Sequence, residues 1–144
     1  MYEPDEQELE FQKSILDEVD HSLTVTFFYN EKRALYGFVA SGTSQFDAYG
    51  EDILSAGVSA LILNTINSLF ALTEDIVEEE TRRNHSSCML PNLKAKNRAS
   101  REAITLLKSL EIGIEGIQHM YGEEHLTIER TYAGPPAKVF KLFK

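Results

Sequence analysis

The chain has 144 residues, of which 42% are apolar, and this is enough for one domain around one hydrophobic core. Its net charge of -9 at pH 7 argues against a protein that neutralises nucleic-acid phosphates. The single cysteine, Cys88, excludes an internal disulfide framework, and the N-terminus has neither the basic flank nor the apolar run of a secretory signal. We therefore expect a cytoplasmic protein with no direct nucleic-acid contact and no membrane role.

Most of the acidity lies in an N-terminal arm. Residues 1–20 contain eight acids and one base. We expect residues 1–21 to form an acidic extension, as a short helix or a disordered segment. Such a charge run is usually a solvated surface, and attraction of a basic partner is the alternative. Four apolar residues of the arm fall at helical spacing: Phe11, Ile15, Leu16 and Val19.

Two strands and a long helix are predicted next. Residues 22–30 alternate apolar and polar side chains, a polar turn follows at 30–33, and residues 34–42 continue as a second strand, so the pair forms a hairpin. A helix that starts with Glu51 and Asp52 follows and carries no further charge along its length. Polar residues interrupt its apolar run, so we expect a buried core helix rather than a membrane span. We expect it to be covered on most sides by the sheet, a second helix or another subunit.

The following segment has a weaker pattern. We expect a strand near Ile76 and Val77, a polar tip at residues 84–87 and a second strand over residues 88–93. Pro91 would limit this second strand to a sheet edge, because proline cannot donate a hydrogen bond to a neighbouring strand.

A second long helix and a last strand complete the pattern. Ser100 is a candidate N-cap, the apolar spacing after it is helical, and Gly122 is a candidate stop. Residues 125–132 alternate as a strand. The element order ββαββαβ predicts an α+β fold, with two helices packed on one mostly antiparallel sheet over residues 22–132. Residues 133–144 form a basic and apolar tail.

The stretch SGTSQFDAYGEDILSAGVSAL, residues 41–61, contains a glycine-flanked loop, an acidic helix start and a helix of small and apolar residues. It resembles the ribosomal-processing cysteine protease family, known as Prp or YsxB-like. Members of that family carry G-H-A, a short acidic or aromatic loop, and then G-x-D-I-V-C-A-A-V-S-A. The matching segments are residues 42–44 and 50–60. The resemblance extends from residue 22 to about residue 132, in both motif and element order.

This resemblance implies a cysteine endopeptidase that processes the N-terminal extension of a large-subunit ribosomal protein. In the family a histidine of the G-H-A loop is the general base and a cysteine of the helix is the nucleophile. Thr43 and Ser55 stand at those two positions here. A threonine hydroxyl cannot accept a proton near pH 7, and serine is a far weaker acid than cysteine. We therefore expect a catalytically inactive relative.

Three routes to a surviving activity stay open, each giving an endopeptidase that acts on the ribosomal-protein extension. Cys88 lies three residues after His85 and could pair with it. The active-site residues could also be rebuilt, or Ser55 could be an engineered replacement made to trap a substrate in an otherwise active enzyme, although this would explain Ser55 but not Thr43. Finally, Ser55 could be served by a histidine from elsewhere in the chain, the candidates being His21, His119 and His125.

Several positions keep the family pattern and can still shape a groove for an extended peptide. Their simpler role is in folding, because glycine allows a tight loop, an acid favours a helix start and a small serine allows close packing. In the functional interpretation, the loop 44–49 is a movable cover of the groove. The groove candidates are Gly42, Ser44, Phe46, Tyr49, Gly50, Asp52 and Ser59.

The expected partner is a peptide or a ribosomal-protein client, which the acidic arm would favour if the client is basic. The chain could compete with an active relative for the client or form a heterodimer with it. We also expect a homodimer, because the resemblance implies one and the first long helix is rich in apolar residues. The tail at residues 138–144 has the composition of such a client and could occupy the groove of its own or a neighbouring subunit, with a disordered tail as the alternative. No residues have metal-ligand spacing, so we expect no metal and no cofactor.

Overall fold

The computed structural model describes residues 5–8, 23–42 and 48–133, and for residues 48–52 it describes the backbone alone. Several predictions concern other parts of the chain and stay predictions. They are the apolar stripe of the N-terminal arm, the C-terminal tail, and the residues His21, Thr43, Ser44 and Phe46.

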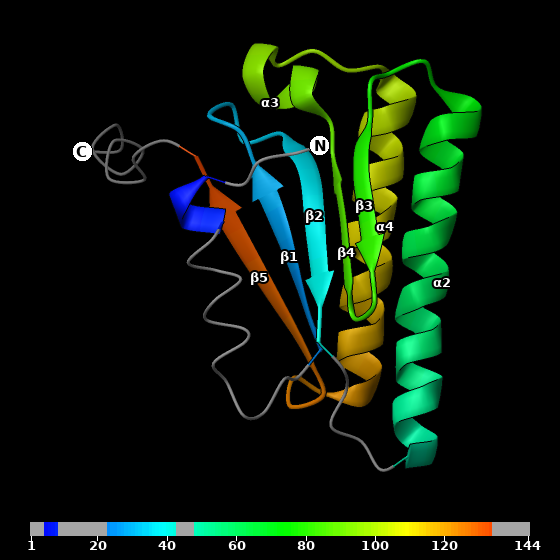
Figure 1. The fold of residues 1–144 in the computed structure, drawn as a ribbon. Coiled ribbons are helices and arrows are strands. Elements are labelled where there is room, and N and C mark those ends of the chain that lie inside the picture. Colours follow the sequence, from blue (N-terminus) through cyan, green and yellow to red (C-terminus); the bar gives the residue numbers. More distant parts are fainter. Residues whose placement is uncertain (1–4, 9–22, 43–47, 134–144) are drawn as a thin grey trace.

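The elements are, in chain order, β1 (Leu23–Tyr29), β2 (Leu35–Ser41), α2 (Ala48–Leu72), β3 (Glu78–Arg82), β4 (His85–Met89), α3 (Pro91–Lys96), α4 (Arg101–Tyr121) and β5 (Leu126–Tyr132). They form two layers, a five-stranded sheet and the two long helices α2 and α4, which lie side by side against one of its faces (Figure 1). The strand order is β3-β4-β2-β1-β5, and all neighbours are antiparallel except β1 and β5. The predicted α+β fold and element order are confirmed, with α3 as an addition.

The core lies between the sheet and the two long helices. Val25 and Phe27 of β1 point into it and are at most 1% exposed. They meet Leu69 of α2 and both Leu107 and Ile114 of α4, which belong to the same buried cluster. The alternation along β1 and the helical spacing along α4 are the patterns that predicted these elements. This packing holds α2, which carries the candidate site, against the rest of the fold.

The second long helix begins and ends at its predicted capping residues. The Ser100 hydroxyl oxygen accepts a hydrogen bond from the Ala103 N–H at 3.0 Å, and Gly122 ends the helix with a φ of 99°. Asp75, which follows α2, accepts hydrogen bonds from the Ser100 N–H at 2.9 Å and the Ser100 hydroxyl at 2.5 Å. The cap therefore also joins the segment after α2 to the start of α4.

The second hairpin exists, but its predicted boundaries are wrong. Strand β3 starts at Glu78, after the predicted Ile76 and Val77, and the chain turns at Arg83 and Asn84. Asn84 has a φ of 58°, a left-handed conformation that asparagine tolerates better than most residues. All residues of β3 are exposed, so burial imposes no alternation that a sequence pattern could reveal.

Pro91 also has a different role from the predicted one. It does not lie in an edge strand but occupies the first turn of α3, because β4 already ends at Met89. The missing N–H of a proline costs nothing at this position, where a helix has no internal acceptor for it. Asn97 ends α3 in a left-handed conformation with a φ of 55°.

Helix α2 starts at Ala48, earlier than the predicted acidic start, so Tyr49 and Gly50 belong to its first turn and not to the preceding loop. Glycine is unfavourable mainly in the interior of a helix, where it costs conformational entropy, so Gly50 is tolerated in this first turn. The predicted cover of the groove is therefore shorter than residues 44–49.

By length and composition alone, residues Ile53–Leu72 of α2 are long and apolar enough to cross a membrane. About a third of this stretch is buried within the protein, and Leu54, Val58 and Leu69 lie in the core, as expected of a core helix. Within the described chain one side of α2 stays exposed, and the prediction that another subunit could cover this side is not tested by a single chain. Its large exposed apolar side chains are Ile53, Leu63, Phe70 and Leu72.

Candidate functional site

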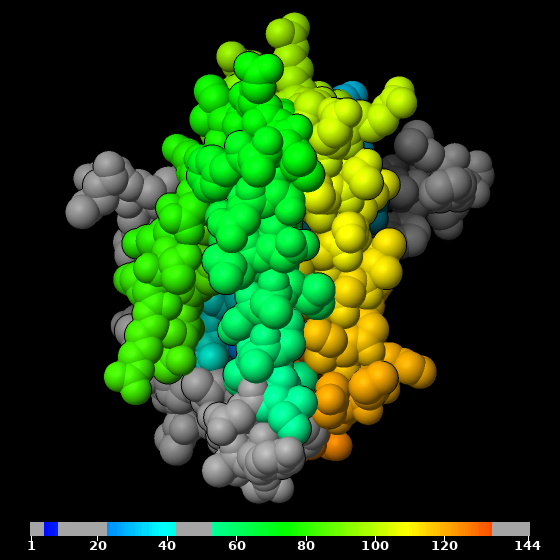
Figure 2. Space-filling model, turned by 90° about the vertical axis from the view of Figure 1, so that its right-hand side faces the viewer, coloured from blue at the N-terminus to red at the C-terminus, as the bar shows by residue number. Residues whose placement is uncertain are grey.

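A pocket of about 340 Å³ lies between α2, the end of β2 and the β3–β4 hairpin. Figure 2 shows the surface hollowed between the hairpin and the lower half of α2. The helix wall is formed by residues that recur every three or four positions, Ser55, Ser59, Leu63 and Ile66. The opposite wall includes Ser41, Gly42 and Thr81. The pocket is therefore polar near Ser55 and apolar further along the helix.

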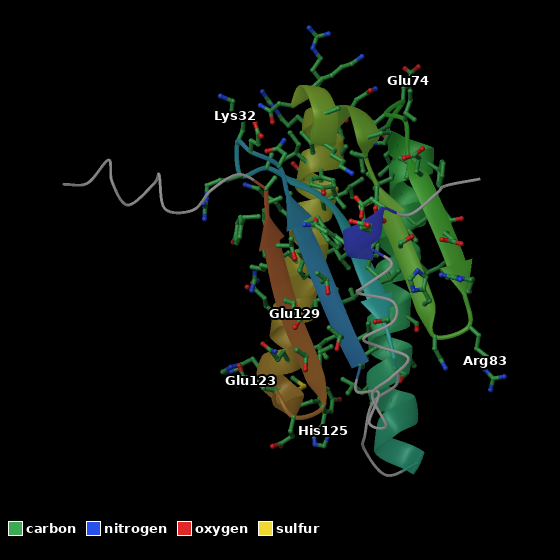
Figure 3. The ribbon with its side chains drawn as sticks, turned by 60° about the vertical axis from the view of Figure 1, so that its left-hand side comes forward. Lys32, Glu74, Arg83, Glu123, His125 and Glu129 are labelled. Carbon is green, nitrogen blue, oxygen red and sulfur yellow. The ribbon has the colours of Figure 1, made fainter. Side chains whose placement is uncertain are left out.

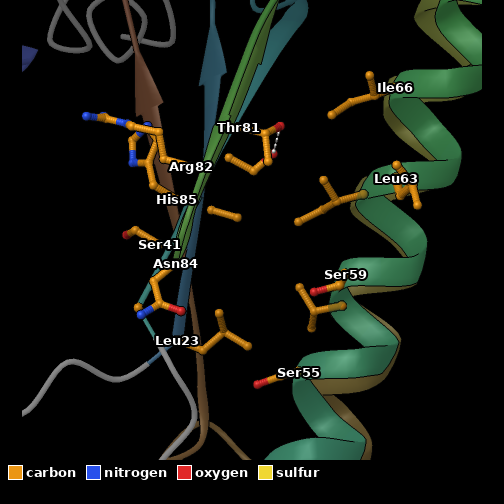
Figure 4. Close-up of a pocket in the computed structure, with 15 residues that line it drawn as sticks. Leu23, Ser41, Ser55, Ser59, Leu63, Ile66, Thr81, Arg82, Asn84 and His85 are labelled. Carbon is orange, nitrogen blue, oxygen red and sulfur yellow. Dashed lines mark hydrogen bonds between the residues drawn. The ribbon is translucent and has the colours of Figure 1, made fainter.

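Ser55 lies in the second turn of α2, is half-buried, and points into the pocket (Figure 4). Gly42 follows the end of β2, and its N–H donates a hydrogen bond to the Asn84 carbonyl oxygen at 3.1 Å. Its φ of 90° lies in the left-handed region that favours glycine. This bond fixes the beginning of the loop against the hairpin turn. Among the predicted site residues, the pocket thus brings together Gly42, Ser55 and Ser59.

The other predicted site residues divide into two groups. Tyr49, Gly50 and Asp52 have a described backbone at the start of α2 but no described side chains. The remaining ones lie outside the described residues, and they are Thr43, Ser44 and Phe46.

His85 lines the pocket as well, although the sequence did not indicate it as a neighbour of Ser55. It starts β4 and lies opposite Ser41 in β2 and Arg82 in β3. Figure 4 shows the imidazole and Arg82 on the side of the hairpin away from α2. Burial, and then the charge of Arg82, lowers the pKa of His85, so the ring is neutral at pH 7. A neutral imidazole can accept a proton, but this one is not directed toward Ser55.

Cys88 has the properties of a core residue. It is fully buried, and burial, followed by the nearby Glu79 carboxylate, raises the pKa of its thiol to about 12. Because side chains alternate along a strand, Cys88 and His85 lie on opposite faces of β4. The pairing of these two residues considered from the sequence is therefore not formed, and Cys88 is not available as a thiolate.

Cys88 is expected to resist thiol reagents in the folded protein. Labelling with a disulfide reagent at pH 8 should be roughly 100-fold slower than in urea-unfolded chain, because the buried thiol reacts only after local opening. Ser109→Cys, on the exposed side of α4, is the matched control and should label rapidly. Equal labelling rates for Cys88 and position 109 in folded protein would contradict this assignment.

Two further histidines lie away from the pocket. His119 is in the last turn of α4, and His125 precedes β5, which forms the sheet edge opposite β3. Figure 3 shows His125 near the start of β5 and Arg83 at the turn of the hairpin. Neither His119 nor His125 lines the pocket, so neither is placed to serve Ser55.

Comparisons with known proteins agree on one relationship. Residues 23–125 match the sequence model of the family described as cysteine protease Prp. Among solved structures, the S. aureus ribosomal processing protease Prp with a covalently linked product peptide is 20% identical, with a TM-score of 0.65 over 76% of this chain and 99% of that one. The same protease with a substrate peptide is 22% identical, with the same TM-score and coverage.

SMU.848 from Streptococcus mutans is also similar, with 22% identity and a TM-score of 0.66 over 77% of this chain and 95% of that one. At these identities the solved structures show a shared fold. A comparison with curated proteins finds no match.

Proposed function

Because the chain belongs to the cysteine protease Prp family, we propose that it is a catalytically inactive member that holds an extended peptide beside Ser55 without cleaving it. One observation carries the proposal. Ser55 stands in the pocket at the position where the family has its nucleophile, while Cys88, the only cysteine of the chain, is buried in the core.

The absence of turnover follows from proton chemistry. A serine hydroxyl attacks a carbonyl only when a base accepts its proton in the transition state. The family's base position holds Thr43, whose hydroxyl cannot accept that proton near pH 7. Within the described part of the chain, the histidine that lines the pocket, His85, extends on the other side of the hairpin.

Peptide binding needs neither a general base nor a nucleophile. It needs space, hydrogen-bond donors and apolar contacts. Ser55 and Ser59 are small and leave room for an extended backbone beside the helix. The start of α2 favours a carbonyl oxygen, because the first N–H groups of a helix lack internal acceptors. Further along the helix, Leu63 and Ile66 can contact an apolar side chain of the peptide.

The proposed partner is a peptide or ribosomal-protein client that the chain meets in the cytoplasm. The related S. aureus structure is described as a ribosomal processing protease in complex with a substrate peptide. For this chain, the net charge of -9 supports a basic client. We propose residues 22–132 as the binding domain, with residues 1–21 and 133–144 as extensions.

Ser59→Arg is expected to weaken peptide binding roughly tenfold or more, because the long side chain would fill the pocket. A fluorescently labelled peptide with the sequence of the ribosomal-protein extension would report binding by anisotropy. Asn67→Arg is the matched control, because it adds the same side chain to an exposed position of α2 outside the pocket. Unchanged affinity for Ser59→Arg would place the peptide elsewhere.

We also propose a homodimer. The support is the exposed apolar content of α2 outside the pocket, where Ile53 and Leu72 are 45% and 66% exposed, more than is usual for such large apolar side chains. Light scattering after size exclusion should give the mass of two 16.3 kDa chains. A monomer mass at every protein concentration tested would contradict the dimer but not the peptide pocket.

A further inference from the structure

We propose that the exposed edge of β3 is a docking site for a basic, extended segment of a partner protein, which adds to the sheet as a further strand. This site lies beside the pocket but depends on none of the chemistry at Ser55. Three features of the molecule support this site: the open edge of β3, the charges of β3 and the apolar flank of α2.

The edge of β3 is open. The strand pairs with β4 from Glu78 opposite Met89 to Arg82 opposite His85, and among the described residues no strand lies on its other side. All five of its residues are exposed. An edge strand directs the N–H and C=O groups of alternate residues outward, and an incoming extended segment can pair with them.

The charges of β3 favour a basic partner at this edge. Glu78, Glu79 and Glu80 follow one another, and in the described chain Glu80 alone of the three has an ion-pair partner, Arg82 at 3.7 Å. Antiparallel pairing with the same edge of a second copy would place Glu80 opposite Glu80, or Glu78 opposite Glu80 in a shifted register, and these contacts are unfavourable. Only the first register offsets this by placing Glu78 opposite Arg82. A basic segment meets the glutamates without such repulsion, so a basic partner fits this edge better than a second copy.

The neighbouring helix adds an apolar requirement. Leu63 and Phe70 lie two helical turns apart on α2, on the same flank as the helix wall of the pocket. Figure 2 shows the hairpin and this helix side by side on one surface. A strand added to β3 would turn every second side chain toward α2. The side chains of the added strand that face α2 would lie near Leu63 and Phe70, so apolar residues are favoured at those positions.

The remaining side chains of the added strand would point to the other face of the sheet. Figure 4 shows Arg82 on the side of the hairpin away from α2, and strand alternation places Glu78 and Glu80 on that same side. Basic residues at these positions would lie near the two glutamates. The fitting segment therefore alternates basic and apolar residues.

The test uses three labelled octapeptides, measured by anisotropy at low salt with the full chain. The probe is KVKVKVKV, the charge control is EVEVEVEV, and KVKPKVKV lacks one backbone N–H donor. We expect the probe to bind at least about tenfold more tightly than either control peptide, because binding uses both charge and strand hydrogen bonds. Equal affinity of the probe and the proline peptide would overturn strand addition.

Protein variants locate the site. Glu78→Lys/Glu80→Lys should weaken probe binding roughly tenfold. Glu123→Lys/Glu129→Lys makes the same charge change at exposed positions near the opposite sheet edge and should leave affinity within about twofold. Equal losses in both double variants would show non-specific charge attraction and overturn the proposal. Ser59→Arg should retain probe binding, and a loss there would assign the probe to the pocket instead.

Discussion

A Thr43→His/Ser55→Cys variant is expected to cleave the ribosomal-protein extension at least roughly 1,000-fold faster than the wild-type chain. The first change restores a general base and the second restores a cysteine nucleophile. Together they lower the activation barrier for peptide cleavage, whereas neither change does so alone. Ser55 already points into the pocket, so the new thiol would occupy the same place beside a bound peptide. Product formation from a synthetic extension peptide, followed by mass spectrometry, measures the gain.

The single variants are the controls for this gain. Ser55→Cys alone leaves a thiol without a base, and such a thiol is mostly protonated at pH 7. Thr43→His alone leaves only a serine, which is a poorer nucleophile. An inactive double variant that still binds the peptide normally would show that the loop and helix no longer bring these positions together.

Gly37→Ala is expected to destabilise the fold by about 3 kcal/mol, lowering the melting temperature by roughly 10 °C. Gly37 lies in β2 opposite Met89 of β4. An added Cβ would meet the Met89 sulfur and would lie 2.5 Å from the Cys88 carbonyl oxygen. The backbone of β4 would have to move away, which would disturb the strand next to the pocket. Thermal unfolding followed by circular dichroism measures the effect.

Gly116→Ala is the matched control for this prediction. It makes the same substitution on the exposed side of α4, where no heavy atom lies within 4 Å of an added Cβ. Alanine is a better helix former than glycine, so this variant should gain about 0.5–1 kcal/mol. Equal stability of the two variants would contradict the close approach of β2 and β4 at Gly37.

The parts of the fold that were predicted correctly are those in which burial or capping leaves a local pattern. Strand β1 alternates because Val25 and Phe27 face the helices. Helix α4 has a serine that caps its start and a glycine that ends it, at Ser100 and Gly122. In both elements the residues that form the pattern lie within one short segment, so the sequence alone was enough to predict the element.

The errors fall where tertiary context decides the structure. Strand β3 is polar on both faces, and its ends are set by pairing with β4 and by the turn at Asn84. A sequence pattern does not contain these long-range contacts. The start of α2 at Ala48 is a different case, because the sequence has Asp47, a preferred N-cap residue type, directly before it and the prediction did not use this signal.

The candidate site shows the same division. The family motif predicted one site that contains Gly42, Ser55 and Ser59. The structure places these three residues along one pocket, and their role in binding a peptide stays a prediction. His85 enters that pocket only because β4 pairs with the end of β2, a contact between segments far apart in the sequence. The alternation of side chains along a strand could have predicted that His85 and Cys88 point to opposite faces of β4. That prediction would have needed the correct first and last residues of β4.

Side-by-side incubation of the wild-type chain and Ser55→Ala with the ribosomal-protein extension peptide, followed by mass spectrometry and anisotropy, tests the central claim most directly. The account predicts no cleavage product from either protein and peptide affinities within about twofold of each other, since the Ser55 hydroxyl is not used as a nucleophile. Cleavage by the wild-type chain that disappears in Ser55→Ala would contradict it and identify Ser55 as a working nucleophile.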